Sequence, residues 1–408
     1  MNIRYIIVAI TIIALTVKIS AQETNLEYRR SSIYSLLINH TNQQFANEIK
    51  DAFLQIPVPD KFNDHNLSVK VLTLDEKLSK ASSSKENPLI TDFLKNNKVA
   101  SRLVGKWFNR DSYTGECDME LVKERGLYNA TEFDKQLAAR SARGIALLQD
   151  AGEELIDNTF VIVNDIRYID KNKGAKVASS AIKILGTLAA AYTGTNIDDL
   201  TDNVGDMVET LKGFTVKINT FLYKLEWTDE QAMLFYKEQY ASVPNKEKKE
   251  NFEKARSKYN LKYVGKVESS GSTTSFMGIK EDEPIMMVRK ACQRAIDENI
   301  VDLQRNYDEF RTKTPLVTTE PLTAYIGMKE GVTLDSQFEV LEAIEMEDGS
   351  RKYNRVGVIA PIKNLIWDNR YMAQEEGAAG SMLGYTTFRT ISGKDFAKGM
   401  LIREMTNK

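Results

Sequence analysis

The chain has 408 residues, of which 42% are hydrophobic and 27% charged, and its formal net charge is −2. This length and composition predict two or three globular domains with ample material for a core. Nucleic-acid binding is not expected, because phosphate contacts need a basic field, and Lys/Arg clusters such as residues 246–249 are short and flanked by Glu.

The first residues have the layout of a secretory signal peptide. Arg4 supplies a positive start, an apolar run of 13 residues extends from Tyr5 to Val17, and Ala21 is a small residue at the predicted cleavage point. Residues 1–21 are therefore predicted to be removed on export. The apolar run is shorter than the roughly 20 residues that a membrane-spanning helix needs, and an uncleaved N-terminal anchor is the alternative.

Residues 22–115 predict an N-terminal α/β segment that packs on the core. Residues 29–38 read as a strand, and residues 43–56 as a helix with apolar side chains at helical spacing. A polar loop follows, and residues 89–108 predict one further helix.

Residues 116–315 predict an α/β core domain. Residues 118–130 read as a short strand with a turn, and a strong helix is expected to begin at Thr131 and end near Asp157. In the strand that follows, residues 160–163 are apolar on both faces, which predicts a central strand covered above and below.

Three charged residues, Asp165, Arg167 and Asp170, lie at the far end of this strand. Asp165 and Arg167 share one face, and we predict that they form a partly exposed ion pair of about 0–1 kcal/mol. A catalytic role would need a third partner, such as a nearby His or Cys, which the local sequence does not supply.

Residues 176–212 predict an excursion of two helices around a turn at residues 193–195. The first helix is rich in small and apolar residues and must bury most of its surface. It is expected to pack on its own partner helix, and docking to a second subunit or to a membrane surface is the alternative.

The rest of the core predicts alternating strands and helices. Residues 213–227 read as a strand with a β-bulge near residues 219–220, because the apolar parity changes there. A helix over 229–240, a strand over 261–267, a loop over 269–275 and a long helix over 284–315 are expected to follow.

Residues 316–408 predict a small β domain, because turns alternate with strand-like runs at 324–332, 336–362, 364–373 and 385–391. Residues 347–350 read as a hairpin turn, and the Gly-rich residues 377–384 as a loop between strands. The fold class is therefore α+β: a mixed sheet with packed helices and a helical-hairpin excursion, followed by a small antiparallel barrel-like C-terminal module.

Few residues suggest chemistry. The two histidines are His40 and His65, and His65 is expected in a polar turn beside Asp64. Cys117 and Cys292 are either bridged or two separate buried thiols.

Two local patterns lack the context that their chemistry needs. Residues 180–183 match an S-x-x-K motif without its companion motifs, and residues 195–206 are acidic without the order of a calcium loop. No catalytic, cofactor-binding or metal-binding residue is predicted, and no cofactor.

Two stretches resemble bacterial envelope families. A helix, an E-R-x-L strand end at residues 124–127, further strands and a late helix containing residues 291–296 resemble the α/β domain of the curli secretion component CsgG. Residues 327–342 resemble the small β module of the flagellar T-ring protein FlgT. Together they cover about residues 90–400 and imply a non-enzymatic envelope assembly or scaffold protein. The chain lacks the lipobox and a paired β-hairpin, so the resemblance does not imply a secretion channel.

We therefore expect an exported, non-enzymatic scaffold or binding protein of the cell envelope, in the periplasm or associated with the outer membrane or cell surface. Its expected partners are envelope proteins or a second copy of itself, contacted through residues 176–212, with membrane-surface contact as a further alternative. The alternative function is a periplasmic envelope hydrolase with an unrecognised site, which labelling of Ser180 by a serine-reactive probe would support.

Overall fold

The computed structural model describes residues 31–73, 87–128, 135, 152–169, 214–272, 284–345 and 351–406. The predicted signal peptide, the excursion at 176–212 with its S-x-x-K motif and acidic segment, most of the helix predicted from Thr131, and the hairpin turn at 347–350 lie outside the described residues.

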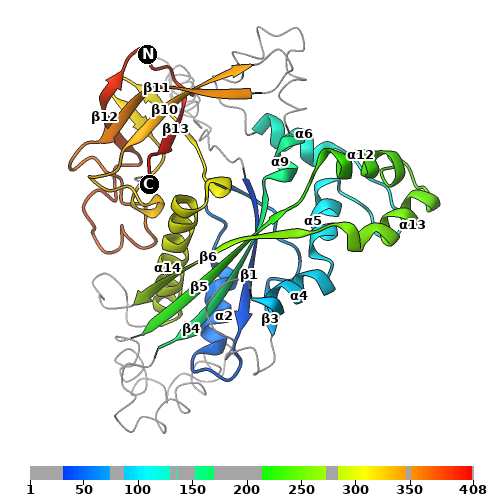
Figure 1. Ribbon diagram of the computed structural model, residues 1–408. Coiled ribbons are helices and arrows are strands. Elements are labelled where there is room, and N and C mark those ends of the chain that lie inside the picture. The colour runs from blue at the N-terminus through cyan, green and yellow to red at the C-terminus, as the bar shows by residue number, and fades with distance from the viewer. Residues whose placement is uncertain are drawn as a thin grey trace, which may run out of the picture.

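A mixed sheet lies at the centre of the larger module (Figure 1). Its strand order is β2-β1-β4-β5-β6, and a further strand, β3, also pairs with β1. The bounds are β1 (Ser31–Asn39), β2 (Phe62–Asp64), β3 (Val71–Thr73), β4 (Thr159–Tyr168), β5 (Thr215–Leu225) and β6 (Leu261–Ser272). β1 is parallel to β2, β3 and β4, whereas β5 and β6 are antiparallel to their neighbours. The segment 22–115 thus contributes a strand directly beside β4.

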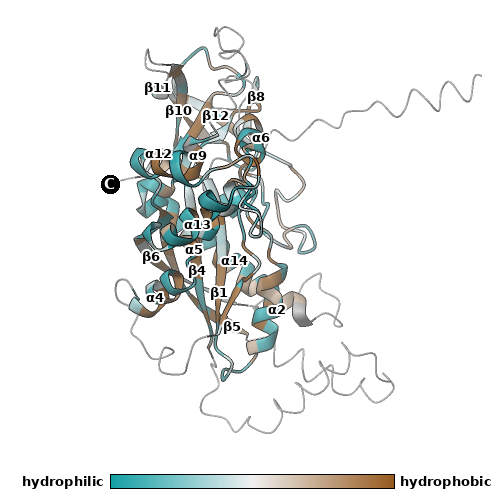
Figure 2. Cartoon of the chain, turned by 90° about the vertical axis from the view of Figure 1, so that its right-hand side faces the viewer, coloured by the Kyte–Doolittle hydropathy of each residue, from teal (hydrophilic) through white to brown (hydrophobic). Residues whose placement is uncertain are grey.

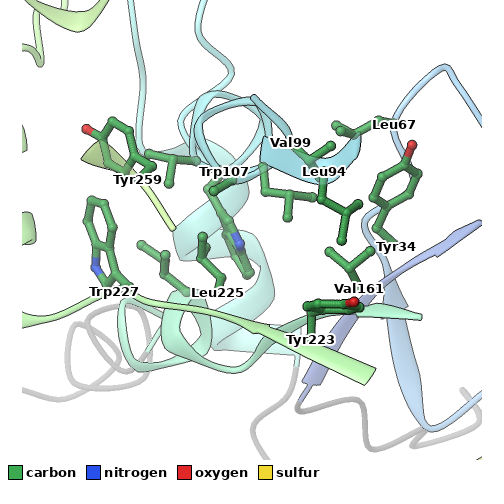
Figure 3. Close-up of a cluster of buried hydrophobic side chains, with 14 of the residues drawn as sticks. Tyr34, Leu67, Leu94, Val99, Trp107, Val161, Tyr223, Leu225, Trp227 and Tyr259 are labelled. Carbon is green, nitrogen blue, oxygen red and sulfur yellow. The ribbon is translucent and has the colours of Figure 1, made fainter. Parts of the chain in front are cut away.

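Helices cover both faces of this sheet. One face packs on α2 (Ala46–Gln55) and α14 (Pro284–Asn306). The core on the other face of the sheet contains more aromatic side chains and is shown in Figure 3. It is built from α4 (Pro88–Asn96), α5 (Val99–Trp107), α6 (Glu120–Tyr128), α9 (Glu154–Asp157), α12 (Asp229–Glu238) and α13 (Lys246–Ala255). These helices turn hydrophilic residues outward, as the hydropathy colouring shows (Figure 2).

The central position predicted for the strand at 160–163 is confirmed. Phe160 and Ile162 belong to the core beneath α2 and α14, and Val161 and Val163 to the opposite core. All four side chains are at most 1% exposed.

The C-terminal module is a curled antiparallel sheet around its own core. Its strand order is β7-β13-β10-β11-β12-β9-β8. The bounds are β7 (Thr314–Pro315), β8 (Thr318–Thr319), β9 (Leu322–Ala324), β10 (Phe338–Glu345), β11 (Arg351–Pro361), β12 (Thr386–Gly393) and β13 (Leu401–Glu404). The predicted fold class, a mixed helix-covered sheet followed by a barrel-like β module, is confirmed for the described residues.

The strand predicted over 118–130 is wrong, because these residues form helix α6. The Asp118 carboxylate accepts a hydrogen bond from the Glu120 N–H at 2.9 Å, as an N-capping side chain does. Val122 and Arg125 are buried three residues apart, which is helical spacing. The E-R-x-L segment therefore lies within a helix and does not end a strand.

The single helix predicted over 89–108 is two helices, α4 and α5. Asn97 is the C-cap of α4, and its side-chain amide donates to the Phe93 carbonyl at 2.9 Å. Lys98 then has a φ of 51°, in the left-handed region, which redirects the chain before α5 begins.

The bulge predicted in β5 is also wrong. The register between β4 and β5 is unbroken, and the irregularity lies in β6, where Val264 has no partner opposite Leu222 and Tyr223. Both faces of β5 are buried, so apolar side chains can point to either face. The shift of the apolar residues from even to odd positions therefore does not require a bulge.

Two other predicted boundaries moved, and two predicted strand-like runs are not strands. The strand expected to end at Val267 continues to Ser272, into the predicted loop. The long helix ends at Asn306, before the 3-10 turn η2 (Asp308–Phe310), and Pro315 lies in β7. The strand-like runs at 324–332 and 364–373 are η3 (Met328–Glu330) and an irregular segment.

Candidate functional site

The charged end of β4 is completed by a histidine from another strand. β1 and β4 are parallel and pair Ile38 with Asp165, so the residues that follow β1 lie beside the end of β4. His40 Nε2 lies 2.5 Å from Asp165 Oδ1. His40, which lies 125 positions earlier in the chain, is therefore the third partner that the residues around Asp165 do not supply.

The predicted pairing of Asp165 with Arg167 is confirmed. Arg167 Nε lies 3.1 Å from Oδ1 and its Nη2 lies 3.2 Å from Oδ2, so the guanidinium holds both carboxylate oxygens. Burial on its own raises the pKa of Asp165, but the hydrogen bond from His40 and the charge of Arg167 outweigh it and the pKa is lowered. Asp165 is thus a carboxylate at neutral pH.

The turn that carries His40 is fastened to β4 by one glutamine. Gln43 Nε2 donates to the Ile166 carbonyl at 3.0 Å, and its Oε1 accepts from the Tyr168 N–H at 3.1 Å. Phe45, with a φ of 60°, then packs edge-on against Tyr168 at 4.9 Å between ring centroids. These contacts fix the position of the imidazole relative to Asp165.

A histidine oriented by a carboxylate is the base half of a nucleophilic hydrolase site. Among the described residues, the only side-chain hydrogen bond of His40 is the one to Asp165, so no described Ser, Thr or Cys is held against its ring. The arrangement acts in this part of the chain as a buried network that links the β1–α2 turn to β4.

The second histidine, His65, does not lie in the polar turn that the sequence predicts. His65 is fully buried and its ring stacks on Trp107 at 5.0 Å between centroids. Its Nε2 lies 3.0 Å from the Leu103 carbonyl and its Nδ1 lies 2.8 Å from Arg125 Nη1. Burial and the Arg125 charge lower the pKa of His65 well below its ordinary value, so the imidazole is neutral, donating from Nε2 and accepting at Nδ1.

Arg125 organises the ends of three elements around this ring. Its Nη1 also donates to Ser32 Oγ at 3.0 Å, its Nη2 donates to the Asp64 carbonyl at 2.9 Å, and its Cζ lies 4.4 Å from the centroid of Trp107. Burial lowers the pKa of Arg125 to about 10, which leaves the guanidinium charged at neutral pH. The cluster joins α6 to β1 and β2 and is structural.

The two cysteines are separate free thiols, which decides between the two alternatives that the sequence left open. Both are buried. Burial raises the pKa of Cys292 to about 12 and also raises the pKa of Cys117, so neither is an activated nucleophile.

An open groove of about 470 Å³ lies beside the loop that connects α5 to α6. Its lining is mostly polar: Asn109, Asp111, Thr114, Glu116, Cys117, Asp118, Met119, Lys123, Tyr240 and Ser242. Three of these residues are acidic and one is basic, so the groove is negative.

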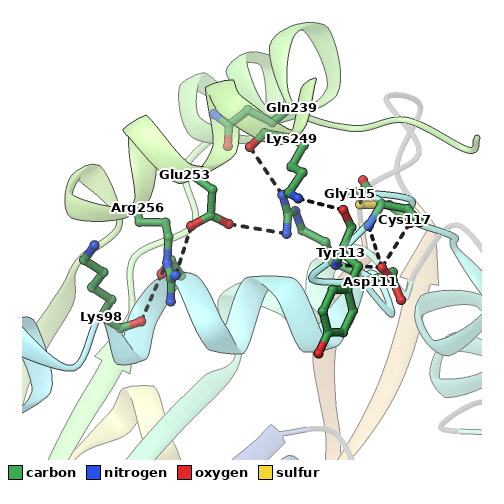
Figure 4. Close-up of polar contacts among 12 residues, drawn as sticks. Lys98, Asp111, Tyr113, Gly115, Cys117, Gln239, Lys249, Glu253 and Arg256 are labelled. Atoms are coloured by element: carbon green, nitrogen blue, oxygen red, sulfur yellow. Dashed lines mark hydrogen bonds and ion pairs between the residues drawn. The ribbon is translucent and has the colours of Figure 1, made fainter. Parts of the chain in front are cut away.

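The loop that forms the groove is held in one conformation (Figure 4). Asp111 Oδ1 accepts hydrogen bonds from the N–H groups of Tyr113 and Thr114 at 2.8 and 2.7 Å, and these bonds lower the pKa of Asp111. Gly115 has a φ of +77°, and a Cβ there would meet the Cβ of Lys249 at 2.6 Å, so glycine is required. Lys249 Nζ in turn donates to the Tyr113 carbonyl at 2.6 Å.

A line of ion pairs behind the loop connects α13 to the residues that follow α5 (Figure 4). Glu253 lies between Arg110, at 3.6 Å, and Arg256, at 3.0 Å. Sequence reasoning missed the groove because its walls come from residues 109–123 and 240–242, and only the Asp111–Gly115 turn has a local signal.

Neither a metal-binding cluster nor a membrane-spanning helix is found among the residues that the structure describes. No group of three or more His, Cys, Asp or Glu side chains could hold a metal ion there. No helix in that part of the chain has the length and apolar character needed to cross a membrane.

No protein-family model matches the chain, and the search of curated proteins found no match either.

Proposed function

We propose that this protein is an exported, non-enzymatic binding or scaffold protein of the cell envelope, and that the groove beside residues 109–118 receives part of a partner protein. The groove carries the proposal, because its volume lies within the roughly 300–1,000 Å³ of ordinary binding pockets and hydrogen bonds hold the loop that forms one of its walls. The signal-peptide layout of residues 1–21 and the resemblance to envelope assembly proteins support the same assignment.

The chemistry of the groove favours a basic partner segment. Asp111, Glu116 and Asp118 outnumber Lys123 along its walls, so a lysine or arginine side chain would be attracted to it. Tyr113, on the same loop, is 85% exposed, and tyrosine is enriched in protein interfaces. Residues 176–212 stay a second proposed contact with envelope proteins, with a second copy or with the membrane surface.

Export is tested at the mature N-terminus. We expect mass spectrometry of the protein from its native cell envelope to find a chain that begins after Ala21 or Gln22, because the apolar run ends at Val17 and a small residue follows. A chain in the envelope fraction that retains Met1 would mean an anchor in place of a cleaved signal.

Partner binding is tested by capture from native envelopes with the mature chain as bait. Glu116 is exposed and makes no side-chain hydrogen bond among the described residues, so Glu116→Lys combined with Tyr113→Ala should fold normally. We expect this variant to lose at least about tenfold of the captured partner, because a cation replaces an anion at the groove. The matched control is Glu375→Lys, an exposed acid on the C-terminal module. Equal capture by the variant and the control would show that the groove is not the binding surface.

An envelope hydrolase is the second candidate, and the His40–Asp165 contact is the observation that favours it. Such an enzyme would need a nucleophile from outside the described residues. Labelling of Ser180 by a serine-reactive probe, abolished by His40→Ala, would replace the scaffold proposal with this one.

A further inference from the structure

A small cavity lies at the junction between the sheet module and the C-terminal module. Its volume is about 30 Å³, enough for roughly two water-sized spheres. It is lined from α14, from the segment before β2, and from η3, β10 and β13. The lining residues that carry charge are Lys61, Arg305, Arg311, Arg403, Glu330 and Glu404.

Positive side chains predominate among the charged residues that line this cavity. Four of the charged lining residues are cations and two are carboxylates, and the outer partners of Arg311 and Arg403, which are Asp308 and Glu339, do not line it. Asp308 is also 60% exposed, so solvent screens its charge.

Both lining carboxylates are already held by other donors. Glu404 accepts Arg305 Nε at 3.1 Å and Nη2 at 2.8 Å. Glu330 Oε2 accepts the Gly327 N–H at 2.7 Å and Asn369 Nδ2 at 2.8 Å. Neither carboxylate forms an ion pair with Lys61.

Lys61 is the charged lining residue to which no hydrogen-bond or ion-pair partner is assigned among the described residues. Within the described ranges its ammonium makes no hydrogen bond and no ion pair, although part of the side chain remains accessible. Burial lowers the pKa of Lys61, and the charges of Glu330 and Glu404 offset this only in part. A cation held in such a position is stabilised by a counterion.

We propose that this junction cavity binds a chloride-sized anion, with Lys61 as its main ligand and the Arg305 and Arg311 guanidinium groups beside it. The size of the cavity selects a single halide over a larger oxyanion such as sulfate. Since the walls of the cavity come from both modules, the bound anion would stabilise the contact between them.

The test compares thermal unfolding of the full chain in sodium chloride and in sodium gluconate at equal ionic strength. We expect chloride to raise the Tm by roughly 3 °C or more once it exceeds its dissociation constant about tenfold, because a ligand that binds only the folded state stabilises it. Lys61→Met, which keeps the length of the side chain without its charge, should lose this difference. The control Lys394→Met removes a lysine whose side chain is 89% exposed and should keep it.

The outcomes separate the site from a general salt effect. An equal response of the wild type, Lys61→Met and Lys394→Met would overturn the proposal, as would a wild type that responds to neither salt. Chloride-35 NMR needs no variant: the folded wild type should broaden the chloride line, and added bromide should reverse the broadening. An unbroadened line would show that the cavity holds only water.

Discussion

Replacing Asp297 by asparagine is expected to change the pH dependence of stability more than any other single substitution considered for this protein. The difference in unfolding free energy between Asp297→Asn and the wild type should grow in favour of the variant by about 4 kcal/mol from pH 4 to pH 8, since the pKa shift is roughly three units at about 1.4 kcal/mol each. Urea unfolding at several pH values measures it.

The cause is a buried carboxyl group on α14. Asp297 is 7% exposed and lines a cavity of about 30 Å³ whose walls are mostly apolar, such as Phe53 and Ile300. No described group hydrogen bonds its Oδ2. Burial therefore raises the pKa of Asp297 to about 7.

Charges from three elements face this carboxyl group and change the shift in both directions. Lys329 and Arg294 lower the pKa of Asp297, whereas Glu330 and Asp60 raise it. Their effects partly cancel, so burial dominates.

The sign of the prediction follows from where the proton is bound. Below pH 4 the carboxyl is protonated in both folded and unfolded chains, so the ionisation changes nothing. Between pH 4 and 7 the unfolded chain loses the proton while the folded chain keeps it, and stability falls as pH rises. Above pH 7 the folded chain also loses the proton, and stability falls no further with pH. Asp335→Asn, at an exposed position, is the control and should show no such growth; a difference that is flat with pH would contradict the prediction.

Arg125→Ala is expected to destabilise the protein by roughly 3–5 kcal/mol. The substitution leaves the Ser32 hydroxyl, His65 Nδ1 and the Asp64 carbonyl without their donor, at about 1–3 kcal/mol for each group that stays unsatisfied. It also removes the guanidinium from the face of Trp107. Denaturant unfolding at neutral pH measures the loss.

Two further variants test that explanation. Arg125→Lys keeps the charge but not the fork of donors, so it should recover only part of the lost stability. Lys123→Ala, at an exposed position on the same helix, should stay within about 0.5 kcal/mol of the wild type. Equal losses in Arg125→Ala and Lys123→Ala would mean that the Arg125 network contributes little.

The sequence by itself determined those elements whose pattern of buried and exposed side chains can be read from consecutive residues. Residues 160–163 are apolar on both faces, and that pattern is enough to require a strand with cover on each side. The alternation and turns after residue 316 likewise required a small antiparallel β module, because a half-buried strand exposes every second residue. The spacing of Asp165 and Arg167 also predicted their pairing.

Only the tertiary structure decided which distant residues meet. His40 and Asp165 are 125 positions apart, and they meet because β1 and β4 pair in parallel and end at the same edge. The burial of His65 depends in the same way on Trp107 and Arg125, which lie on two later helices. Local sequence sets the conformation of a segment, but contacts between segments depend on the register and packing of whole elements, and no local pattern encodes these.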